Sequence, residues 1–258
     1  MRPLSVAGVG LWTPGHDSPA AWIERRRDPQ ALRPRCDILD SRIGRYTSLV
    51  TRMAVHALEQ AAAQGRAPLK EVAAIFGSAY GEIRTAFDQL DMIEREGVPS
   101  PARFKNSVHN TAAGHVSIAT GNMGFSTALA AGGATFAMCL LEAFAWLEAR
   151  RGSVIVAVAD EPLPDHLATV GRYEALGVAF CLSSDPPSGG GLAGLSDLRR
   201  RGPKCPPGGV PERLAGNPCA AALPLVEAVM RRRSGIVPVE QGGEGWSVEL
   251  QVGGRAAP

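Results

Sequence analysis

Residues 132–149 are the segment that most constrains the fold of this chain. Apolar side chains occupy nearly every side of a helix drawn over them, and charge enters only at Glu142 and Glu148. A helix that is apolar all round lies in the interior of a protein, covered on both faces. The segment therefore predicts a buried central helix with other layers of structure around it.

Short apolar runs alternate with segments of helical periodicity along the rest of the chain. The expected strands span 4–12, 72–76, 125–131, 153–159 and 178–182, and further expected helices span 46–64, 82–96 and 112–119. Strands that alternate with helices favour an α/β domain with a mixed, mostly parallel sheet, here of five strands. Residues 16–45, rich in Pro, Arg and Asp, predict a partly helical surface excursion.

The character of the sequence changes near Pro186. Two Gly- and Pro-rich stretches, 186–191 and 202–209, enclose one possible strand over 192–198. An expected helix over 220–233, strands over 236–239 and 246–252, and a tail from 253 follow. We therefore expect a domain over residues 1–185 and a short C-terminal extension over residues 186–258 that packs on the same domain.

Composition excludes several classes of function. The net charge of +2 gives no support for a nucleic-acid partner. The five cysteines are scattered without a CxxC motif, so neither a disulfide framework nor a metal site is expected. No apolar run reaches transmembrane length and no phosphate-loop motif occurs, so we expect a cytoplasmic protein without membrane contact or cofactor.

Two motifs follow each other between Asn110 and Gly132. Residues 110–114 read Asn-Thr-Ala-Ala-Gly, and residues 126–132 read Ser-Thr-Ala-Leu-Ala-Ala-Gly. In order and spacing they resemble the β-ketoacyl synthases, where an Asn-x-x-Ala-Gly stretch precedes a short strand reading Ser-Thr-Ala-Cys-x-x-Gly. The resemblance extends from about residue 4 to residue 185. It implies the N-terminal half of the thiolase-like fold.

Two departures from the family pattern bear on activity. The nucleophile position of the family falls on Leu129, and a Leu side chain can form no acyl-enzyme. The family also carries two catalytic His residues in its C-terminal half. The histidines of this chain all lie in its first two thirds, at His16, His56, His109, His115 and His166. The resemblance therefore implies a protein without catalytic residues for condensation.

Such losses are typical of one subgroup of the family, the chain length factors. This chain resembles a short member, similar to those of aryl polyene and polyketide pathways. The resemblance implies a heterodimer with an active β-ketoacyl-ACP synthase, and an acyl carrier protein as a further partner. The edge strand that includes Phe125, Ser126, Thr127 and Ala128 would pair with its counterpart at the dimer interface.

The same resemblance implies a tunnel for the growing acyl chain. The helix from Glu82 would form a wall of this tunnel, with Thr85, Ala86 and Phe87 as wall residues. The loop over 100–110 would approach the partner's active site through Arg103 and Phe104.

Other interpretations of the sequence stay open. The chain could be a half-length acyltransferase with Cys139 or Ser126 as nucleophile, or a homodimer that binds acyl chains or carrier protein. The pair Asp160–Glu161 could serve acid–base chemistry or cap a turn. Two arginine runs, 199–201 and 231–233, could dock an acidic carrier protein or be solvated surface.

Overall fold

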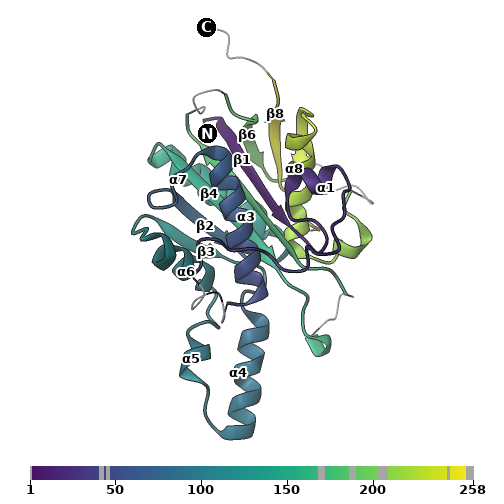
Figure 1. Ribbon diagram of the computed structural model, residues 1–258. Coiled ribbons are helices and arrows are strands. Elements are labelled where there is room, and N and C mark those ends of the chain that lie inside the picture. Colours follow the sequence, from purple (N-terminus) through teal and green to yellow (C-terminus); the bar gives the residue numbers. More distant parts are fainter. Residues whose placement is uncertain are drawn as a thin grey trace.

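The computed structural model describes residues 2–40, 44, 47–167, 172–185, 190–202, 209–242 and 245–253. Over these residues the centre is one mixed sheet of eight strands in the order β3-β2-β4-β5-β1-β6-β8-β7 (Figure 1). The strands are β1 (Leu4–Trp12), β2 (Ala73–Gly77), β3 (Ser126–Leu129), β4 (Ser153–Asp160), β5 (Leu176–Ser183), β6 (Ala193–Arg199), β7 (Gly235–Pro238) and β8 (Ser247–Gln251).

The α/β class is confirmed, but the expected number and direction of strands are wrong. The five expected strands lie side by side as β3-β2-β4-β5-β1, and three strands of the extension continue the same sheet. Only β2 runs parallel to its neighbours β3 and β4, whereas every other adjacent pair is antiparallel. Among the described residues no α-helix lies between β4 and β5, and the chain returns antiparallel.

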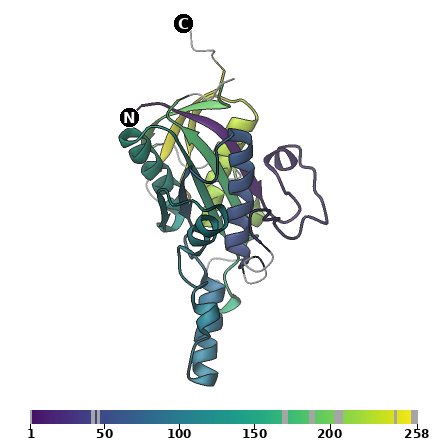
Figure 2. The same ribbon diagram turned by 60° about the vertical axis from the view of Figure 1, so that its left-hand side comes forward.

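Helices cover both faces of this sheet (Figure 2). The helices of the described residues are α1 (Pro19–Ile23), α3 (Leu49–Gly65), α4 (Ile83–Glu96), α5 (Pro101–Phe104), α6 (Thr111–Thr120), α7 (Thr135–Ala149) and α8 (Leu223–Met230), of which α4 and α5 lie away from the sheet. Four short 3-10 turns are η1 (Gly132–Ala134), η2 (Asp165–Leu167), η3 (Glu212–Leu214) and η4 (Pro218–Ala222). One core lies where α3 and α6 meet one face, and a second lies where α7, η4 and α8 meet the other.

Helix α3 packs directly against the backbone of β1. A Cβ on Gly8 would lie 2.2 Å from the carbonyl oxygen of Ala61, and one on Gly10 would lie 1.9 Å from that of Ala57. Only glycine permits so close an approach. The helix begins where the Ser48 hydroxyl accepts a hydrogen bond from the N–H of Thr51 at 3.1 Å, a typical N-cap.

Helix α7, the central helix of the sequence analysis, is buried on one side only. Phe136, Leu140 and Phe144 are buried against the sheet and η4. Leu141 and Ala145 face outward and are exposed. The expectation that this helix is covered on both faces is therefore wrong for the single chain.

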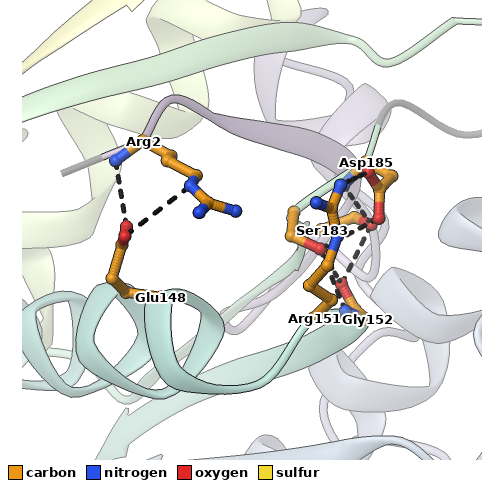
Figure 3. A network of polar contacts seen from close by, with 7 residues as sticks. Arg2, Glu148, Arg151, Gly152, Ser183 and Asp185 are labelled. Carbon is orange, nitrogen blue, oxygen red and sulfur yellow. Dashed lines mark hydrogen bonds and ion pairs between the residues drawn. The ribbon is translucent and has the colours of Figure 1, made fainter.

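Polar contacts at one end of the sheet join the start of β1 to the end of α7 and the start of β4 to the end of β5 (Figure 3). Arg151 forms an ion pair with Asp185, and Arg2 forms one with Glu148 at 3.6 Å. The Asp185 pKa is lowered by the hydrogen bond from Arg151. This end lies opposite the ends of β2 and β4 that carry the candidate site.

Helices α4 and α5 form an arm that projects away from the sheet (Figure 1). The arm was expected as a helix over 82–96 followed by a loop, and α5 adds a short helix inside that loop. Within the arm the N–H of Ser100 donates to Oε1 of Gln89 at 3.0 Å, which ties the returning chain to α4. The domain boundary at 185/186 stays a prediction, because residues 186–189 lie outside the described residues.

Candidate functional site

Strand β3 is one edge of the sheet and pairs only with β2. The N–H of Ala74 donates to the carbonyl oxygen of Phe125 at 3.0 Å, and the N–H of Ser78 donates to that of Leu129 at 3.1 Å. Successive residues of a strand present their backbone groups to opposite sides. The backbone groups of Ser126 and Ala128 therefore point outward, where a further strand could pair with them.

The two edges of the sheet differ in their protection. Strand β7, at the other edge, reads Gly-Ile-Val-Pro, and its Pro238 lacks an N–H for a further strand. Strand β3 reads Ser-Thr-Ala-Leu, with neither proline nor charge. Proteins usually blunt an exposed edge with proline or charge. The β3 edge is thus left in a form suited to pairing.

Apolar side chains and an open groove lie beside the β3 edge. Ile118 and Met123 are 72% and 93% exposed, and the ring of Phe125 stacks on Trp146 with 5.8 Å between the ring centroids. The groove measures about 520 Å³ and runs between α6 and β3. Its lining residues are His109, Asn110, Ala113, Gly114, Ser117, Ser126, Thr127 and Ala128. This face brings together the four predicted interface residues, Phe125 to Ala128.

Leu129 is the last residue of β3, half-buried against the core, and does not lie at a helix N-terminus. Turn η1 follows over Gly132–Ala134, and α7 begins at Thr135. The Thr135 hydroxyl donates to the carbonyl oxygen of Gly132 at 2.7 Å and accepts from the N–H of Ala131 at 3.0 Å. The position at which the motif predicts the nucleophile, Leu129, therefore lies three residues before the turn η1 that leads into α7.

The start of α7 is covered by the C-terminal part of the chain. The N–H of Gln241 donates to the carbonyl oxygen of Gly133 at 3.1 Å. A Cβ on Gly133 would lie 2.3 Å from the Gln241 carbonyl oxygen. No side chain larger than hydrogen fits at Gly133 unless this segment moves.

The thiols nearest to this region are buried. Cys139 lies one turn inside α7 and is fully buried, which raises its thiol pKa to about 12. Cys219 lies in η4, and its pKa is also raised by burial. A buried thiol of this kind carries little thiolate near neutral pH and is a poor nucleophile. Cys139 is therefore unsuited to the nucleophilic role that the sequence left open for it.

Asp160 ends β4 and binds the turn that follows β2. Its carboxylate accepts hydrogen bonds from the Ser78 hydroxyl at 2.6 Å and from the N–H groups of Ala79 and Tyr80 at 3.0 and 3.2 Å. The thiol of Cys219 donates to it at 3.1 Å. Of the two roles left open for Asp160, these contacts favour the structural one.

Glu161 and Glu82 complete a buried group of carboxyls beside Asp160. Glu161 is 5% exposed, and burial raises its pKa to about 7 although Arg84 lies 3.6 Å away. Its Oε1 has no hydrogen-bond partner among the described residues. Burial also raises the pKa of Glu82, which accepts from the hydroxyls of Ser48 at 2.8 Å and Thr85 at 3.2 Å. The helical periodicity of the sequence does not indicate that Glu82 is buried. Its partners come from the N-cap of α3 (Ser48) and from α4 (Thr85).

The predicted wall residues Thr85, Ala86 and Phe87 lie together in the first two turns of α4, half-buried. The ring of Phe87 meets His166 of η2 edge to face, with centroids 4.7 Å apart. A cavity of about 20 Å³ lies at the N-terminal end of α4, lined by Glu82 and His109 but by none of the three wall residues. It has room for about one water molecule, so this chain alone encloses no acyl tunnel here.

The predicted loop contacts Arg103 and Phe104 lie on α5, at the side of the arm that faces solvent. Phe104 is 56% exposed, and Leu90 and Ile93 of α4 are 57% and 42% exposed. Among the described residues, no hydrogen bond, ion pair or ring contact joins Arg103 or Phe104 to the three wall residues. The arm instead presents an apolar surface away from the sheet.

His109, in the loop before α6, and His115, within α6, both have structural partners. Nε2 of His109 is 2.9 Å from the carbonyl oxygen of Ser78, and Nε2 of His115 is 3.3 Å from Oδ1 of Asn106. Across the described residues, no group of His, Cys, Asp and Glu has the geometry of a metal site. Within the same residues no helix is long and apolar enough to cross a bilayer. Cys205 lies outside them.

Comparison with protein families gives one result that bears on this site. A profile of the β-ketoacyl synthase N-terminal domain matches residues 20–194. No curated protein matches the chain.

Solved structures of ketosynthases share the fold. A chain from the complex of the ketosynthase ApeO with its chain length factor ApeC from Xenorhabdus doucetiae is 20% identical, with a TM-score of 0.72, and the match covers 96% of this chain and 100% of that one. A chain of the ishigamide ketosynthase/chain length factor is 17% identical, with a TM-score of 0.58 and coverage of 90% and 73%. A chain of the complex of the type II polyketide ketosynthase AntDE with its acyl carrier protein AntF is 13% identical, with a TM-score of 0.62 and coverage of 79% and 71%. The thiolase-like ketosynthase fold expected from the sequence is confirmed.

Proposed function

The chain belongs to the β-ketoacyl synthase family, and we propose that it serves there as a non-catalytic chain length factor. It pairs with an active β-ketoacyl-ACP synthase in the cytoplasm and shapes the tunnel in which that enzyme extends an acyl chain. The products are of the polyketide or aryl polyene kind. One observation carries the proposal: the stretch from β3 to the start of α7, Ser126 to Thr135, contains no thiol.

This observation does not depend on a single aligned position. Leu129 ends the strand, and Gly132, Gly133 and Ala134 lead into the helix, so no position at the helix start carries a nucleophilic sulfur. A helix N-terminus favours a thiolate only when a cysteine is present there. The cover provided by Gln241 leaves no room for a side chain at Gly133. Both facts support a subunit without an acyl-enzyme intermediate.

The free edge of β3 supports the proposal that a strand of the partner pairs with it. Ser126 and Ala128 turn their backbone groups outward, and exposed apolar residues flank them. The outer side of α7 leaves Leu141 exposed, and Trp146 of the same helix contacts Phe125 beside β3. A partner that pairs with β3 would also cover this side. A chain that alone leaves its central helix half exposed fits a subunit of a larger assembly.

The tunnel is proposed to form only in the pair. The cavity at the start of α4 measures about 20 Å³ and is not lined by the wall residues, whereas pockets that hold an organic ligand are typically several hundred Å³. Thr85, Ala86 and Phe87 would close the far end of a tunnel that begins in the partner. The arm residues Arg103 and Phe104 would contact the partner near its active site. The acyl carrier protein would deliver substrate to the ketosynthase of the pair.

The edge pairing can be tested with prolines at backbone positions that face outward. Ala128→Pro removes an outward N–H of β3 and leaves the bonds to β2 from Phe125 and Leu129 in place. Ile236→Pro is the matched control, because Val237 and Val239 direct their backbone groups to β8 and Ile236 faces outward at the opposite edge. Each variant is co-expressed with the ketosynthase encoded beside this chain, and the tagged ketosynthase is purified.

We expect Ala128→Pro to lower recovery of the chain at least about tenfold, which corresponds to about 1.4 kcal/mol of binding free energy. Ile236→Pro should co-purify like the wild type. Circular dichroism of both variants checks that they are folded. Full recovery of a folded Ala128→Pro chain would refute pairing through β3.

A further inference from the structure

A cavity of about 320 Å³ lies on the opposite side of the molecule from the β3 edge, where α1 lies beside α8 (Figure 1). It is lined by His16, Trp22, Arg25, Arg27, Pro211, Arg213, Glu227 and Arg231. We call it the arginine pocket. It contains no residue of the site described above. Of its lining residues, Arg231 belongs to an arginine run that the sequence offered as a docking surface, and no sequence motif joins the others to it.

Three separate segments of the chain bring the four arginines together. Arg25 and Arg27 follow α1, Arg213 lies in η3, and Arg231 follows α8. In α8, Glu227 lies one helical turn before Arg231 and also lines the pocket. The only signal in the sequence was the run of arginines over 231–233, and two of its three members do not line the pocket.

The charges in this pocket are largely uncompensated. Arg213 forms an ion pair with Glu174 at 3.4 Å, with both side chains about one-third exposed. Neither Arg25 nor Arg27 has an ion pair or side-chain hydrogen bond within the described part of the chain. Arg231 also donates to the carbonyl oxygen of Ile23 at 3.2 Å. With Arg213 paired to Glu174, the one lining carboxylate, that of Glu227, faces the guanidinium groups of Arg25, Arg27 and Arg231. An excess of like charge in a concave site favours an anionic ligand.

The floor of the pocket is a fixed surface with an unused polar atom. The ring of Trp22 is buried, and the guanidinium of Arg213 lies over it at 5.6 Å, which holds its plane in place. His16 is 5% exposed and meets Trp22 edge to face at 5.4 Å. Nδ1 of His16 is buried without a hydrogen-bond partner in the parts of the chain that we describe. A buried polar atom without a partner is costly unless a ligand supplies one.

The surroundings of His16 favour the neutral form of its ring. Its pKa is lowered by burial and by the nearby guanidinium groups of Arg213 and Arg27. A neutral imidazole can donate one hydrogen bond to a ligand oxygen or accept one from a protonated ligand. The pocket thus offers several planar guanidinium donors around one imidazole nitrogen.

We propose that the arginine pocket binds a phosphate-bearing anion with two or more negative charges. A guanidinium binds phosphate through two parallel hydrogen bonds, and several together suit a ligand with many oxygens. A single carboxylate would leave most of the positive charge unbalanced. The volume of about 320 Å³ exceeds that of one phosphate group, so a diphosphate or a phosphate ester of a larger molecule fits the site.

The test is isothermal titration calorimetry on the full chain, alone or in the complex in which it purifies, at low ionic strength. Inorganic pyrophosphate is the main probe, and ADP, orthophosphate and acetate are compared with it. We expect binding in the order of negative charge, with acetate undetected. ADP binding more tightly than pyrophosphate would identify an organic phosphate ester as the source, and the reverse order would identify the free ion.

Variants locate the binding. Arg25→Gln and Arg27→Gln remove exposed side chains that form no ion pair or side-chain hydrogen bond with other described residues, and each should weaken pyrophosphate binding about tenfold, the effect of losing one strong charge-assisted contact. Arg26→Gln is the matched control, because Arg26 lies between them, pairs with Glu24 and does not line the pocket. Its affinity should stay within about twofold of the wild type.

Four results would overturn the proposal. The first three are no binding of pyrophosphate at 10 mM, equal loss of affinity in Arg26→Gln and Arg27→Gln, and equal binding of acetate and pyrophosphate. Displacement of pyrophosphate by an acyl carrier protein that lacks its phosphopantetheine group would also do so, because it would show that the pocket receives an acidic protein surface.

Discussion

The N–H of Gln241 donates a hydrogen bond of 3.1 Å to the carbonyl oxygen of Gly133, and this contact closes the chain over the start of its central helix. Gly133 lies before the change in composition near Pro186 and Gln241 lies after it, so the sequence alone assigns them to different parts of the chain. In the folded chain the segment after β7 covers the turn η1 that leads into α7. The C-terminal extension thus takes part in the candidate site.

Gly133→Ala should destabilise the protein. The new Cβ would lie 2.3 Å from the Gln241 carbonyl oxygen, so the covering segment must shift. We expect a loss of about 2 kcal/mol in the free energy of unfolding, as for other overpacked sites. Urea unfolding measures it.

Gly132→Ala is the control for this prediction. A Cβ there meets no atom within 4 Å, but the residue has a φ of +55°, so a loss of only about 1 kcal/mol is expected from the backbone. An equal or smaller loss for Gly133→Ala would show that the cover is not tight.

The chain should form no covalent acyl adduct. Its thiol nearest to the site, Cys139, is fully buried with a pKa raised to about 12. Incubation with an acyl thioester followed by intact-mass measurement should show the unmodified mass. Leu129→Cys places a thiol at the end of a strand, and this variant alone should show no condensation of malonyl and acyl thioesters. An adduct in the wild type that disappears in Cys139→Ala would contradict the account.

Glu161 should make stability depend on pH. Burial raises its folded-state pKa from 4.5 to about 7, so the folded state favours the protonated carboxyl. Its contribution is fully present below about pH 4.5 and is lost as the pH rises to about 7. Glu161→Gln, which cannot ionise, should gain stability relative to the wild type between pH 5 and pH 8, by up to about 3 kcal/mol.

The exposed Glu94 of α4 provides the control for this series. The difference in free energy of unfolding between Glu94→Gln and the wild type should be the same at pH 5 and at pH 8. A Glu161→Gln protein that tracks the wild type over the same range would show that Glu161 is ionised in the fold.

Phe87 should limit the length of the product made by the pair. Its ring contacts His166 at the base of the arm, where the proposed tunnel ends. Phe87→Ala removes that bulk, and the pair should then release longer chains, measured by mass spectrometry of the products. Phe104→Ala, on the exposed side of the arm, is the comparison and should alter pairing rather than chain length. Unchanged products from Phe87→Ala would remove α4 from the tunnel wall.

The sequence was sufficient for the strands and helices of the first 185 residues because their apolar periodicity is strong. Strand direction was not recoverable, because β5 returns antiparallel to β4 and the extension adds antiparallel strands through pairings that no local pattern records. The half exposure of α7 was missed for a related reason. An apolar helix is expected to be buried, but a single chain can leave one side for a partner.

The same reasoning explains what was found and missed in the site. The β3 edge follows from a motif that is continuous in sequence, whereas the wall residues come from the family resemblance and stay a prediction. The contact between Gly133 and Gln241, and the carboxyl group formed by Glu82, Asp160 and Glu161, join segments that only the fold brings together. The position of Leu129 shows the limit of motif spacing. A motif fixes the order of residues but does not show where a strand ends and a helix begins.

The measurement that tests the central claim most directly is the mass in solution, by light scattering after size exclusion, of this chain alone and co-expressed with the ketosynthase encoded beside it. The account predicts a stable one-to-one complex, with the chain alone poorly soluble or aggregated. A well-behaved homodimer that does not bind the ketosynthase would contradict it.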